Sequence, residues 1–405
     1  MHKNDFISKY MLHAVELAKR GTGFVNPNPL VGAVIVKDGR IIGEGWHHRY
    51  GELHAEREAI RSAGVENCRG ADLYVTLEPC CHTGKQPPCT EAIIRAGFAR
   101  VFTGSRDPNP LVSGKGTAAL KAAGIEVHAD MMRTACDALN PVFFYYITSK
   151  IPYVIMKYAM TADGLTACCT GKSRWVSGEE SRLFVHQERA AYMAVMTGIG
   201  TVLQDDPLLT CRLYPENASC GQNSAQPVRQ PVRIVCDSRL RIPPESTLVR
   251  TAHDIPLLIV CACSSQELAD PACAAGKKAA VLRAAGAEIL CVPESAGSHV
   301  DLKKLMHILG SRGIDSILLE GGSTLNYAAL KAGIVQKVQV FIAPKLFGQL
   351  SVPGGDSSGS EVHIHTPVQG ILAESPDDAL LLSSPSVRTF GSDVLLEYTL
   401  CRAVS

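Results

Sequence analysis

Short apolar segments alternate with helical patterns along most of this chain, and this alternation limits the possible folds more than any other feature. In the first third, VGAVIV (31–36) and LYVTLE (73–78) are typical of buried strands. A KDGR turn joins the first of them to IIGEG, and a helical pattern at about 54–62 precedes the second. The order strand, helix, strand then continues through CTEAIIRAG, RVFTG, GTAALKAAG and IEVHA. It predicts an α/β fold with a mostly parallel sheet covered by helices, and polar functional groups at strand ends and helix starts.

The pattern changes near residues 140–152, where the aromatic segment FFYYITSKIP precedes a new strand pattern, YVIMKYAM. A chain of 405 residues exceeds one ordinary core, since domains hold roughly 100–200 residues. We therefore expect two domains, 1–147 and 148–405. The second repeats the alternation, with strands expected at YMAVMTG, VRIVCDS, IPLLIV, AEILCV, DSILLEGG, KVQVFIAP and VLLEYTL; stretches rich in Gly, Ser, Asn and Pro at 214–231 and 353–360 are expected to be loops.

The overall charge favours a small-molecule partner. Lys and Arg number 40 against 39 Asp and Glu, so no strong field attracts nucleic acid or an anionic membrane. The longest apolar runs are shorter than the ~20 residues of a membrane span, and the N-terminus lacks the apolar region of a signal peptide. Fifteen cysteines, an odd number in a long chain, indicate reduced thiols rather than a disulfide framework. We expect a cytoplasmic protein.

One group of residues has the composition of a catalytic zinc site. His54 opens the first helical pattern, and Cys80 and Cys89 follow the next strand. A catalytic zinc ion takes three nitrogen or sulfur ligands and leaves its fourth position to water, and Glu56 is suited to moving that water's proton. Because eight residues separate Cys80 from Cys89, Cys81 and His82 remain alternatives for the third ligand; a structural site closed by four ligands is the non-catalytic alternative.

The H-A-E and P-C elements resemble those of zinc deaminases that act on amino-pyrimidines. Together with NPNPLVGAVIV, TLEPCCHTGKQPPC and RDPNPLVSGKG, they are similar to the deaminase half of the bifunctional riboflavin-biosynthesis deaminase/reductases, in which the eight-residue gap is usual. The resemblance covers nearly the whole chain, because the reductase half is matched by MTADGLTA, SRWVSGEE, GIGTVLQDDPLLTCR, PVRIVCDS, LLEGGSTL and IAPKLFG. It implies a cytidine-deaminase-like zinc domain followed by a dihydrofolate-reductase-like α/β domain.

The resemblance also implies the chemistry. The first domain would hydrolyse the 2-amino group of 2,5-diamino-6-ribosylamino-4-pyrimidinone 5′-phosphate, with zinc held by His54, Cys80 and Cys89 and with Glu56 as the catalytic acid and base. The second would use NADPH to reduce the ribosyl group to ribityl. Two positions depart from the family's pattern: Cys81 stands where a serine is usual, and Leu165 where a basic residue is more common.

Further site residues follow from the same resemblance. Substrate contacts in the first domain are Asn28, His47 and Lys85; an amide can read a pyrimidine edge, and histidine and lysine suit a phosphate. Those in the second domain are Ser173, Arg189, Leu209, Arg212 and Glu320. The cofactor contacts are Ala159, Trp175, Thr201, Asp205, Ser238, Gly322, Ser323, Thr324, Leu325, Asn326, Tyr327 and Ala328.

One cofactor segment also has a physical motive of its own. The sequence EGGSTLNYA (320–328) follows the strand pattern DSILL and opens a helix, so its glycines and free N–H groups suit a pyrophosphate. Alone, the segment also fits a simple strand-to-helix turn with a cap. No side chain of the second domain stands out as the acid, although Lys157 and Asp205 are candidates for proton transfer.

Two other classes of function compete with this assignment. A deaminase of nucleic-acid bases would use the same zinc chemistry but needs a basic groove, which the near-neutral charge opposes. A zinc-stabilised binding protein would keep the metal ligands without needing Glu56. Apolar strand edges and the aromatic segment favour self-association into a homo-oligomer.

Overall fold

The computed structural model describes residues 3–213, 228–294, 299–348 and 365–401. The described chain divides into two compact units: the first holds residues 3–151 together with 228 and 229, and the second holds the remaining described residues from Pro152 onward. The domain boundary expected between residues 147 and 148 falls inside the last helix of the first unit. The loops expected at 214–231 and 353–360 lie outside the described residues, apart from 228–231.

The first unit alternates strands and helices after a long N-terminal helix that was not among the expected elements. Its helices are α1 (Lys3–Lys19), α2 (Ala55–Ala63), the 3₁₀ turn η1 (Val65–Cys68), α3 (Cys89–Ala96), α4 (Lys115–Ala122), α5 (Arg133–Asp137) and α6 (Pro141–Ser149). Its strands are β1 (Gly32–Lys37), β2 (Arg40–Trp46), β3 (Asp72–Leu77), β4 (Arg100–Ser105) and β5 (Glu126–His128).

These strands form a five-stranded sheet in the order β2-β1-β3-β4-β5. The expectation of a mostly parallel sheet is wrong for this unit, because β1 runs antiparallel to both β2 and β3, and only β3, β4 and β5 are parallel. The reason is local: Asp38 and Gly39 form a two-residue hairpin between β1 and β2, and both have positive φ (51° and 73°). This conformation matches the twist of paired antiparallel strands.

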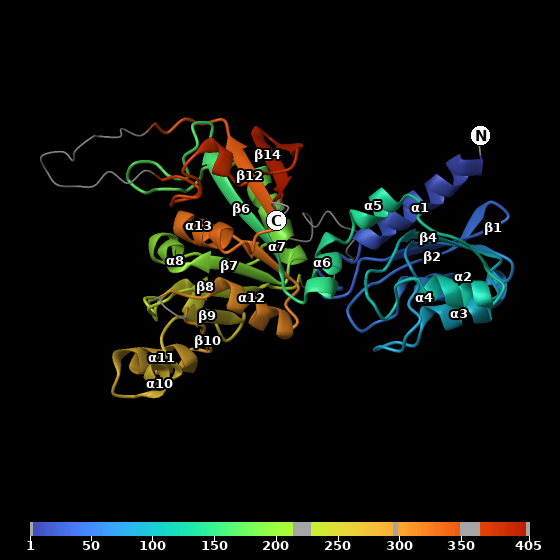
Figure 1. Cartoon of the computed structure of the whole chain (residues 1–405), viewed down its shortest axis with the longest axis horizontal. Helices are drawn as coiled ribbons and strands as arrows, with labels where there is room; N and C mark the ends of the chain where they lie inside the picture. The colour runs from blue at the N-terminus through green and yellow to red at the C-terminus, as the bar shows by residue number, and fades with distance from the viewer. Residues whose placement is uncertain (1–2, 214–227, 295–298, 349–364, 402–405) are drawn as a thin grey trace, which may run out of the picture. The chain divides into compact units, whose positions relative to one another are not determined.

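Alternating side chains of β1 supply both faces of the sheet. Ala33 and Ile35 pack in a buried cluster with residues of α2, α3 and α4, whereas Val34 and Val36 pack in another cluster with residues of α1. This is the period of two expected of a strand buried on both sides. The sheet is therefore a middle layer, with α1 on one side and α2, α3 and α4 on the other (Figure 1).

The second unit contains the longer sheet. Its strands are β6 (Tyr153–Thr161), β7 (Ala194–Gly198), β8 (Val232–Cys236), β9 (Leu257–Cys261), β10 (Glu288–Cys291), β11 (Ser316–Leu319), β12 (Lys337–Ala343), β13 (Ser386–Phe390) and β14 (Asp393–Thr399). Its helices are α7 (Glu179–Ala191), α8 (Ile199–Asp205), α9 (Thr247–Arg250), α10 (Ser265–Ala269), α11 (Ala274–Ala284), α12 (Leu302–Ser311), α13 (Ser323–Lys331) and the 3₁₀ turn η3 (Pro376–Asp378).

The order of this nine-stranded sheet is β10-β9-β8-β7-β11-β6-β12-β14-β13. The strands from β10 to β12 are parallel, as expected, and β14 and β13 add an antiparallel edge. The edge strand β13 was not predicted, because its residues are mostly exposed and give no apolar run. From β6 the chain adds β7, β8, β9 and β10 toward one edge, and then returns to place β11 beside β6 and β12 on the other side of β6. Open α/β sheets bind ligands where the strand order reverses in this way.

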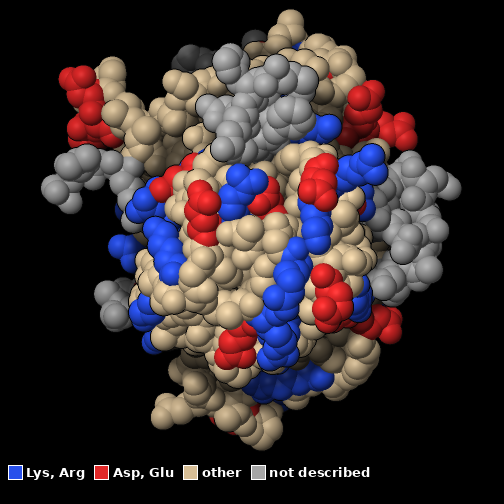
Figure 2. Space-filling view, turned by 90° about the vertical axis from the view of Figure 1, so that its right-hand side faces the viewer, with Lys and Arg blue, Asp and Glu red and all other residues tan. Residues whose placement is uncertain are grey.

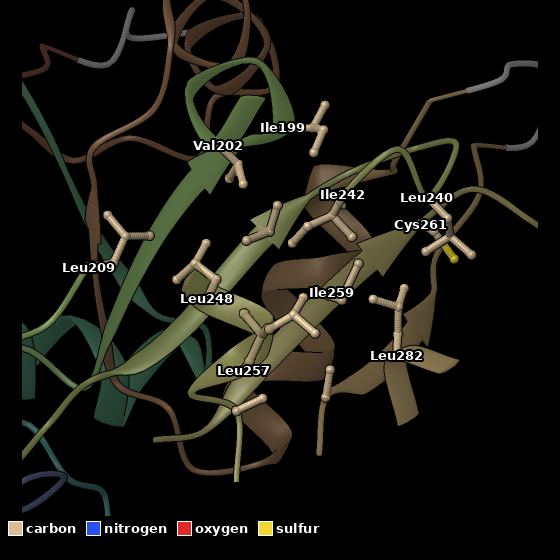
Figure 3. Close-up of a cluster of buried hydrophobic side chains, with 14 of the residues drawn as sticks. Ile199, Val202, Leu209, Leu240, Ile242, Leu248, Leu257, Ile259, Cys261 and Leu282 are labelled. Carbon is tan, nitrogen blue, oxygen red and sulfur yellow. The ribbon is translucent and has the colours of Figure 1, made fainter. Parts of the chain in front are cut away.

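The core of the second unit lies under the parallel strands. Ile259 of β9 packs in one buried cluster with Leu248 of α9 and Leu282 of α11, and Figure 3 shows these side chains turned toward one another. Val202 of α8 joins the same cluster. Among the described residues, no helix combines the length and apolar character needed to cross a membrane.

Candidate functional sites

Three potential metal ligands converge at one end of the first unit's sheet. His54 is the residue before α2, Cys80 follows β3, and Cys89 opens α3. The His54 Nδ1 atom lies 3.5 Å from Cys80 Sγ and 3.3 Å from Cys89 Sγ. A tetrahedral zinc ion with the usual bond lengths holds nitrogen and sulfur donors ~3.5–3.8 Å apart. The three side chains thus fit zinc with little movement.

The two other candidates for the third ligand lie outside this group. Among the described residues, the set of donor atoms close enough to share a metal is His54, Cys80 and Cys89, without Cys81 or His82. The Cys81 thiol points to the carbonyl of Leu111, 3.7 Å away. The eight residues between Cys80 and Cys89 therefore form a loop that brings Cys89 back to the metal-binding group, while Cys81 and His82 lie outside that group.

The electrostatics of the group suit metal binding and proton transfer. A hydrogen bond from Cys89 lowers the pKa of Cys80 to about 4, so that Cys80 is a thiolate, the form that binds metal. Glu56, only 4 % exposed, is the second residue of α2, with its carboxyl group in reach of the Cys89 thiol. Burial raises the pKa of Glu56, which brings this carboxyl group closer to the range of a general acid and base at neutral pH.

A cavity of about 310 Å³ opens beside the group. Its lining includes His54, Glu56 and Cys80, as well as the three predicted substrate contacts Asn28, His47 and Lys85. The structure thus brings together the candidate ligands, the candidate acid and base, and the candidate binding residues. The cavity volume is near the lower limit for small-molecule sites.

His47 and Asn28 act as one hydrogen-bonded pair. His47 is buried, and burial lowers its pKa to about 4, so the ring is neutral near pH 7. Its Nδ1 atom lies 3.0 Å from the Leu53 carbonyl and must donate, which leaves Nε2 to accept from the Asn28 amide at 3.1 Å. This arrangement orients the Asn28 amide and makes His47 a neutral hydrogen-bonding group rather than a second cation beside Lys85.

Residues that the sequence did not single out also line this cavity. Asp107 and Asn109, in the quoted motif RDPNP, follow the carboxyl end of β4, and Tyr146 comes from α6. Burial raises the pKa of Asp107 to about 6. Polar residues directly after a parallel strand are a recognisable signal, because such strand ends share one edge of the sheet. The contribution of α6 has no such signal.

The second unit holds a larger cavity, of about 1590 Å³. Every predicted cofactor contact lines it: Ala159, Trp175, Thr201, Asp205, Ser238, Gly322, Ser323, Thr324, Leu325, Asn326, Tyr327 and Ala328. So do all five predicted substrate contacts: Ser173, Arg189, Leu209, Arg212 and Glu320. Residues spread over more than 160 positions therefore meet at the same hollow, whose size suits a dinucleotide with a second ligand.

Two helix starts face this cavity. Gly322 is the residue before α13, and Gly198 the residue before α8; both line the cavity. A methyl group on Gly322 would lie 3.2 Å from Thr201 Oγ1, so glycine permits a close approach there. Helix starts present unpaired N–H groups and favour anions. The segment 320–328 is thus a strand-to-helix turn that can also hold a phosphate.

A charged cluster forms the inner wall of the cavity. The Arg189 guanidinium makes two bonds to Glu320, Nε to Oε1 at 2.6 Å and Nη2 to Oε2 at 2.9 Å, and both side chains are 12 % exposed. Burial opposes ionisation of Glu320, but Arg189 outweighs it and lowers the pKa of Glu320. Burial also lowers the pKa of Lys157, which lies within electrostatic range of the pair. The second predicted arginine, Arg212, lines the same cavity and donates from Nη1 to Thr210 Oγ1 at 3.4 Å.

Two protein-family models match the chain. Residues 4–105 match the cytidine and deoxycytidylate deaminase zinc-binding region, and residues 152–395 match the RibD C-terminal domain. The first match contains the three candidate ligands and Glu56. The second contains all the predicted contacts of the larger cavity.

Individual relatives align over most of the sequence. The chain is 46 % identical to the riboflavin biosynthesis protein RibD of Actinobacillus pleuropneumoniae over 389 residues, which cover 96 % of this chain and 94 % of that protein. It is 41 % identical to the protein of the same name from Escherichia coli, with coverage of 84 % and 88 %.

Two solved structures are similar over nearly the full length. RibD of Acinetobacter baumannii has a TM-score of 0.81 at 34 % identity, covering 99 % of this chain and 100 % of that one. A diaminohydroxyphosphoribosylaminopyrimidine deaminase/5-amino-6-(5-phosphoribosylamino)uracil reductase of Thermotoga maritima has a TM-score of 0.78 at 34 % identity, with the same coverage.

Proposed function

The chain belongs to the RibD family of riboflavin biosynthesis proteins, and from this premise we propose which residues perform its two reactions. It is a bifunctional enzyme with a zinc-binding deaminase domain followed by a reductase domain. We assign the hydrolytic deamination to residues 1–147 and the reduction to residues 148–405.

The deaminase substrate we propose is 2,5-diamino-6-ribosylamino-4-pyrimidinone 5′-phosphate. The observation that carries this assignment is the convergence of His54, Cys80 and Cys89, with Glu56 in reach of the Cys89 thiol, beside a cavity that His54, Glu56 and Cys80 line. Asn28, fixed by its bond to His47, would hydrogen-bond the pyrimidine edge. Lys85, at the exposed side of the cavity, would neutralise the phosphate.

His54, Cys80 and Cys89 would hold zinc. When bound, zinc would lower the pKa of a water molecule, so that this water can lose a proton and act as the nucleophile toward the ring. Glu56 would take a proton from this water at a carboxylate oxygen and deliver it to the departing amino nitrogen, so that ammonia leaves. The raised pKa that burial gives Glu56 makes its carboxylate a stronger base for taking the proton. The side chains around it keep bulk water from the carboxyl group.

The reductase cofactor we propose is NADPH, bound in the larger cavity with its phosphates at the starts of α8 and α13. Reduction of the ribosyl to the ribityl group adds one hydride and one proton. The cofactor supplies the hydride, and the protein orients its nicotinamide against the sugar carbon. Lys157, whose pKa is lowered by burial beside Glu320, is our candidate for the proton, and Arg212 for the sugar phosphate.

A small phosphorylated pyrimidine, rather than nucleic acid or a membrane, is the partner we propose. On the face seen in Figure 2, basic and acidic side chains are interspersed instead of forming one basic groove of the kind a nucleic-acid deaminase needs. A cytoplasmic location and self-association, both expected from the composition and the sequence, remain part of this proposal.

The decisive experiment substitutes the candidate acid and base. Glu56→Gln should reduce ammonia release by at least about a hundredfold, the lower range for losing a general acid and base, and leave NADPH-dependent reduction of supplied deaminated intermediate unchanged. The matched control is Glu58→Gln on the same helix, since Glu58 pairs with Arg61 and does not line the cavity. Ammonia and NADPH absorbance are followed separately.

Two outcomes would contradict the proposal. Unchanged ammonia release in Glu56→Gln would favour a structural zinc site or a binding protein. Loss of both reactions in this variant would argue against assigning the two reactions to separate units. Activity on a cytosine-containing oligonucleotide, with none on the pyrimidine phosphate, would favour the nucleic-acid deaminase.

A further inference from the structure

One wall of the larger cavity consists of an irregular segment, residues 166–176, which we name the Trp175 segment. It contains no helix or strand, although it lies between β6 and α7. Several of its residues line the cavity: Thr166, Ala167, Gly171, Ser173, Arg174 and Trp175. Because the segment lacks the regular backbone hydrogen bonds of a helix or strand, its position depends on individual hydrogen bonds to other parts of the chain, which we call tethers.

Trp175 itself is poorly supported by packing. Trp175 is 59 % exposed, and the guanidinium groups of Arg182 and Arg174 lie over its ring, at 4.6 and 5.8 Å from the centroid. Exposed cation–π contacts of this kind are weak. The ring is therefore placed mainly by the backbone that carries it.

That backbone is held by a lysine from another part of the chain. The Lys345 ammonium donates to the Trp175 and Val176 carbonyls, both at 2.8 Å. Lys345 comes from the loop after β12, in the motif IAPKLFG, and does not line the cavity. A single charged donor bridging two successive carbonyls fixes both the place and the direction of the peptide between them.

The loop that carries Lys345 is anchored in turn. The Ala162 amide donates to the Lys345 carbonyl at 2.9 Å, just beyond the paired ends of β6 and β12. The Asp163 carboxylate accepts from the Phe347 amide at 3.1 Å and from the Gly348 amide at 2.8 Å. The tether thus connects the carboxyl ends of β6 and β12 to the Trp175 segment through three motifs, MTADGLTA, IAPKLFG and SRWVSGEE.

We infer that Lys345 is a positioning residue of the reductase: its two carbonyl bonds hold the Trp175 segment in the orientation that binds the nicotinamide cofactor. The inference rests on the proposed function, in which Trp175 contacts NADPH. Lys345 touches neither cofactor nor substrate in this scheme. It acts through the backbone of Trp175, and so affects binding more than the chemical step.

The first test separates binding from chemistry. Lys345→Met should raise the KM for NADPH roughly three- to tenfold, the range for losing exposed charge-assisted hydrogen bonds, while kcat stays within about twofold. Lys345→Arg should restore most of the affinity, because a guanidinium also offers two N–H donors. Ammonia release by the same preparation checks the deaminase domain, and Lys277→Met, an exposed lysine of α11, is the matched control.

The second test observes the segment directly. The chain has two tryptophans, so a Trp46→Phe background leaves Trp175 as the only one. In this background Lys345→Met should lower the fluorescence anisotropy of Trp175 and increase its quenching by acrylamide. Lys277→Met should change neither. Should Lys345→Met fold poorly, Lys345→Gln, which keeps one N–H donor pair, should give an intermediate change in both measurements.

The outcomes distinguish a failure of this inference from a failure of the proposed NADPH contact of Trp175. Unchanged NADPH KM and unchanged Trp175 anisotropy in Lys345→Met would overturn the inference. Trp175→Ala tests the assigned cofactor contact: an unchanged KM in this variant would overturn that assignment instead. If both residues act together, Lys345→Met should add little to the KM in a Trp175→Ala background, whereas a full additional rise would show that Lys345 acts elsewhere.

Discussion

Individual side chains in this enzyme are tuned by where the fold buries them. The Glu188 carboxylate, on α7, accepts a bond from Gln339 Nε2 at 2.9 Å, and Gln339 also bonds to Glu397. Burial raises the pKa of Glu188, although Gln339 and Lys337 oppose the rise. The carboxyl group therefore binds a proton more tightly in the folded than in the unfolded chain.

This has a consequence for stability against pH. The contribution of a carboxyl group with a raised folded pKa is fully present below its unfolded pKa, and it is lost as the pH rises through the folded value. The free energy of unfolding should therefore fall as the pH rises above about 4, the pKa of Glu in an unfolded chain. Glu188→Gln removes this titration, so it should reduce that fall and stabilise the enzyme at pH 7–8. Urea unfolding from pH 4 to pH 8 measures this.

The control for that prediction is Glu179→Gln, at the exposed start of the same helix. It should leave the shape of the profile unchanged. A Glu188→Gln variant whose stability falls with pH as steeply as that of the parent would mean that the titrating group is another one.

At the scale of elements, the deaminase site depends on how closely α2 packs against β2. Gly43 and Gly45 of β2 face this helix, and a methyl group on Gly45 would lie 2.4 Å from the Ala55 carbonyl oxygen and from the Ala59 amide. Such a contact is impossible without moving backbone. Because His54 and Glu56 sit at the start of α2, the packing of this helix sets the position of a ligand and of the catalytic carboxyl group together.

Gly45→Ala should accordingly displace α2 and impair the zinc site while the protein remains folded. We expect at least a tenfold loss of ammonia release and a lower zinc content, since ~1 Å of misplacement can cost about a hundredfold in rate. NADPH-dependent reduction serves as the internal control and should be unchanged. Full ammonia release with one zinc per chain would show that the sheet and helix can separate without cost to the site.

Over the whole molecule, the two cavities are lined by residues of different units. Each reaction therefore has its own set of side chains, and the deaminated intermediate is the chemical link between them. Within the described residues, the one group of donor atoms close enough to share a metal is His54, Cys80 and Cys89, our proposed zinc ligands, and all three lie before residue 151. Loss of the metal should separate the two activities.

Removing zinc with a chelator should abolish ammonia release and spare NADPH-dependent reduction of supplied intermediate. Added zinc should restore the first activity, and Cys80→Ala should prevent that recovery. Metal analysis should find one zinc per native chain and none after Cys80→Ala. Parallel loss of the reductase on chelation would show that zinc also supports the second unit.

Much of the fold follows from local patterns. In the second unit, apolar runs of strand length predicted all the strands except β13. In the first unit, the strands and α2 lie close to the predicted positions. Several elements were missed: α1, whose residues were examined only as a signal-peptide candidate, α5 and α6, which were not predicted as helices, and β13, an exposed edge strand without an apolar run. The expectation of a mostly parallel sheet was wrong for the first unit because the β1–β2 hairpin makes β1 antiparallel to both of its neighbours.

The sequence by itself determined the chemistry: the ligand types His54, Cys80 and Cys89, the carboxyl group of Glu56 and the glycine-rich turn before α13 are identities, and their spacing limits them to helix starts and strand ends. Only the tertiary structure decided which of several nearby residues takes each role and which groups pair with one another. It selected Cys89 over Cys81 and His82, made His47 neutral by burying it against Leu53 and Asn28, and paired Arg189 with Glu320. Those choices depend on distances and desolvation, which arise when segments far apart in the chain pack together, and a linear pattern carries neither.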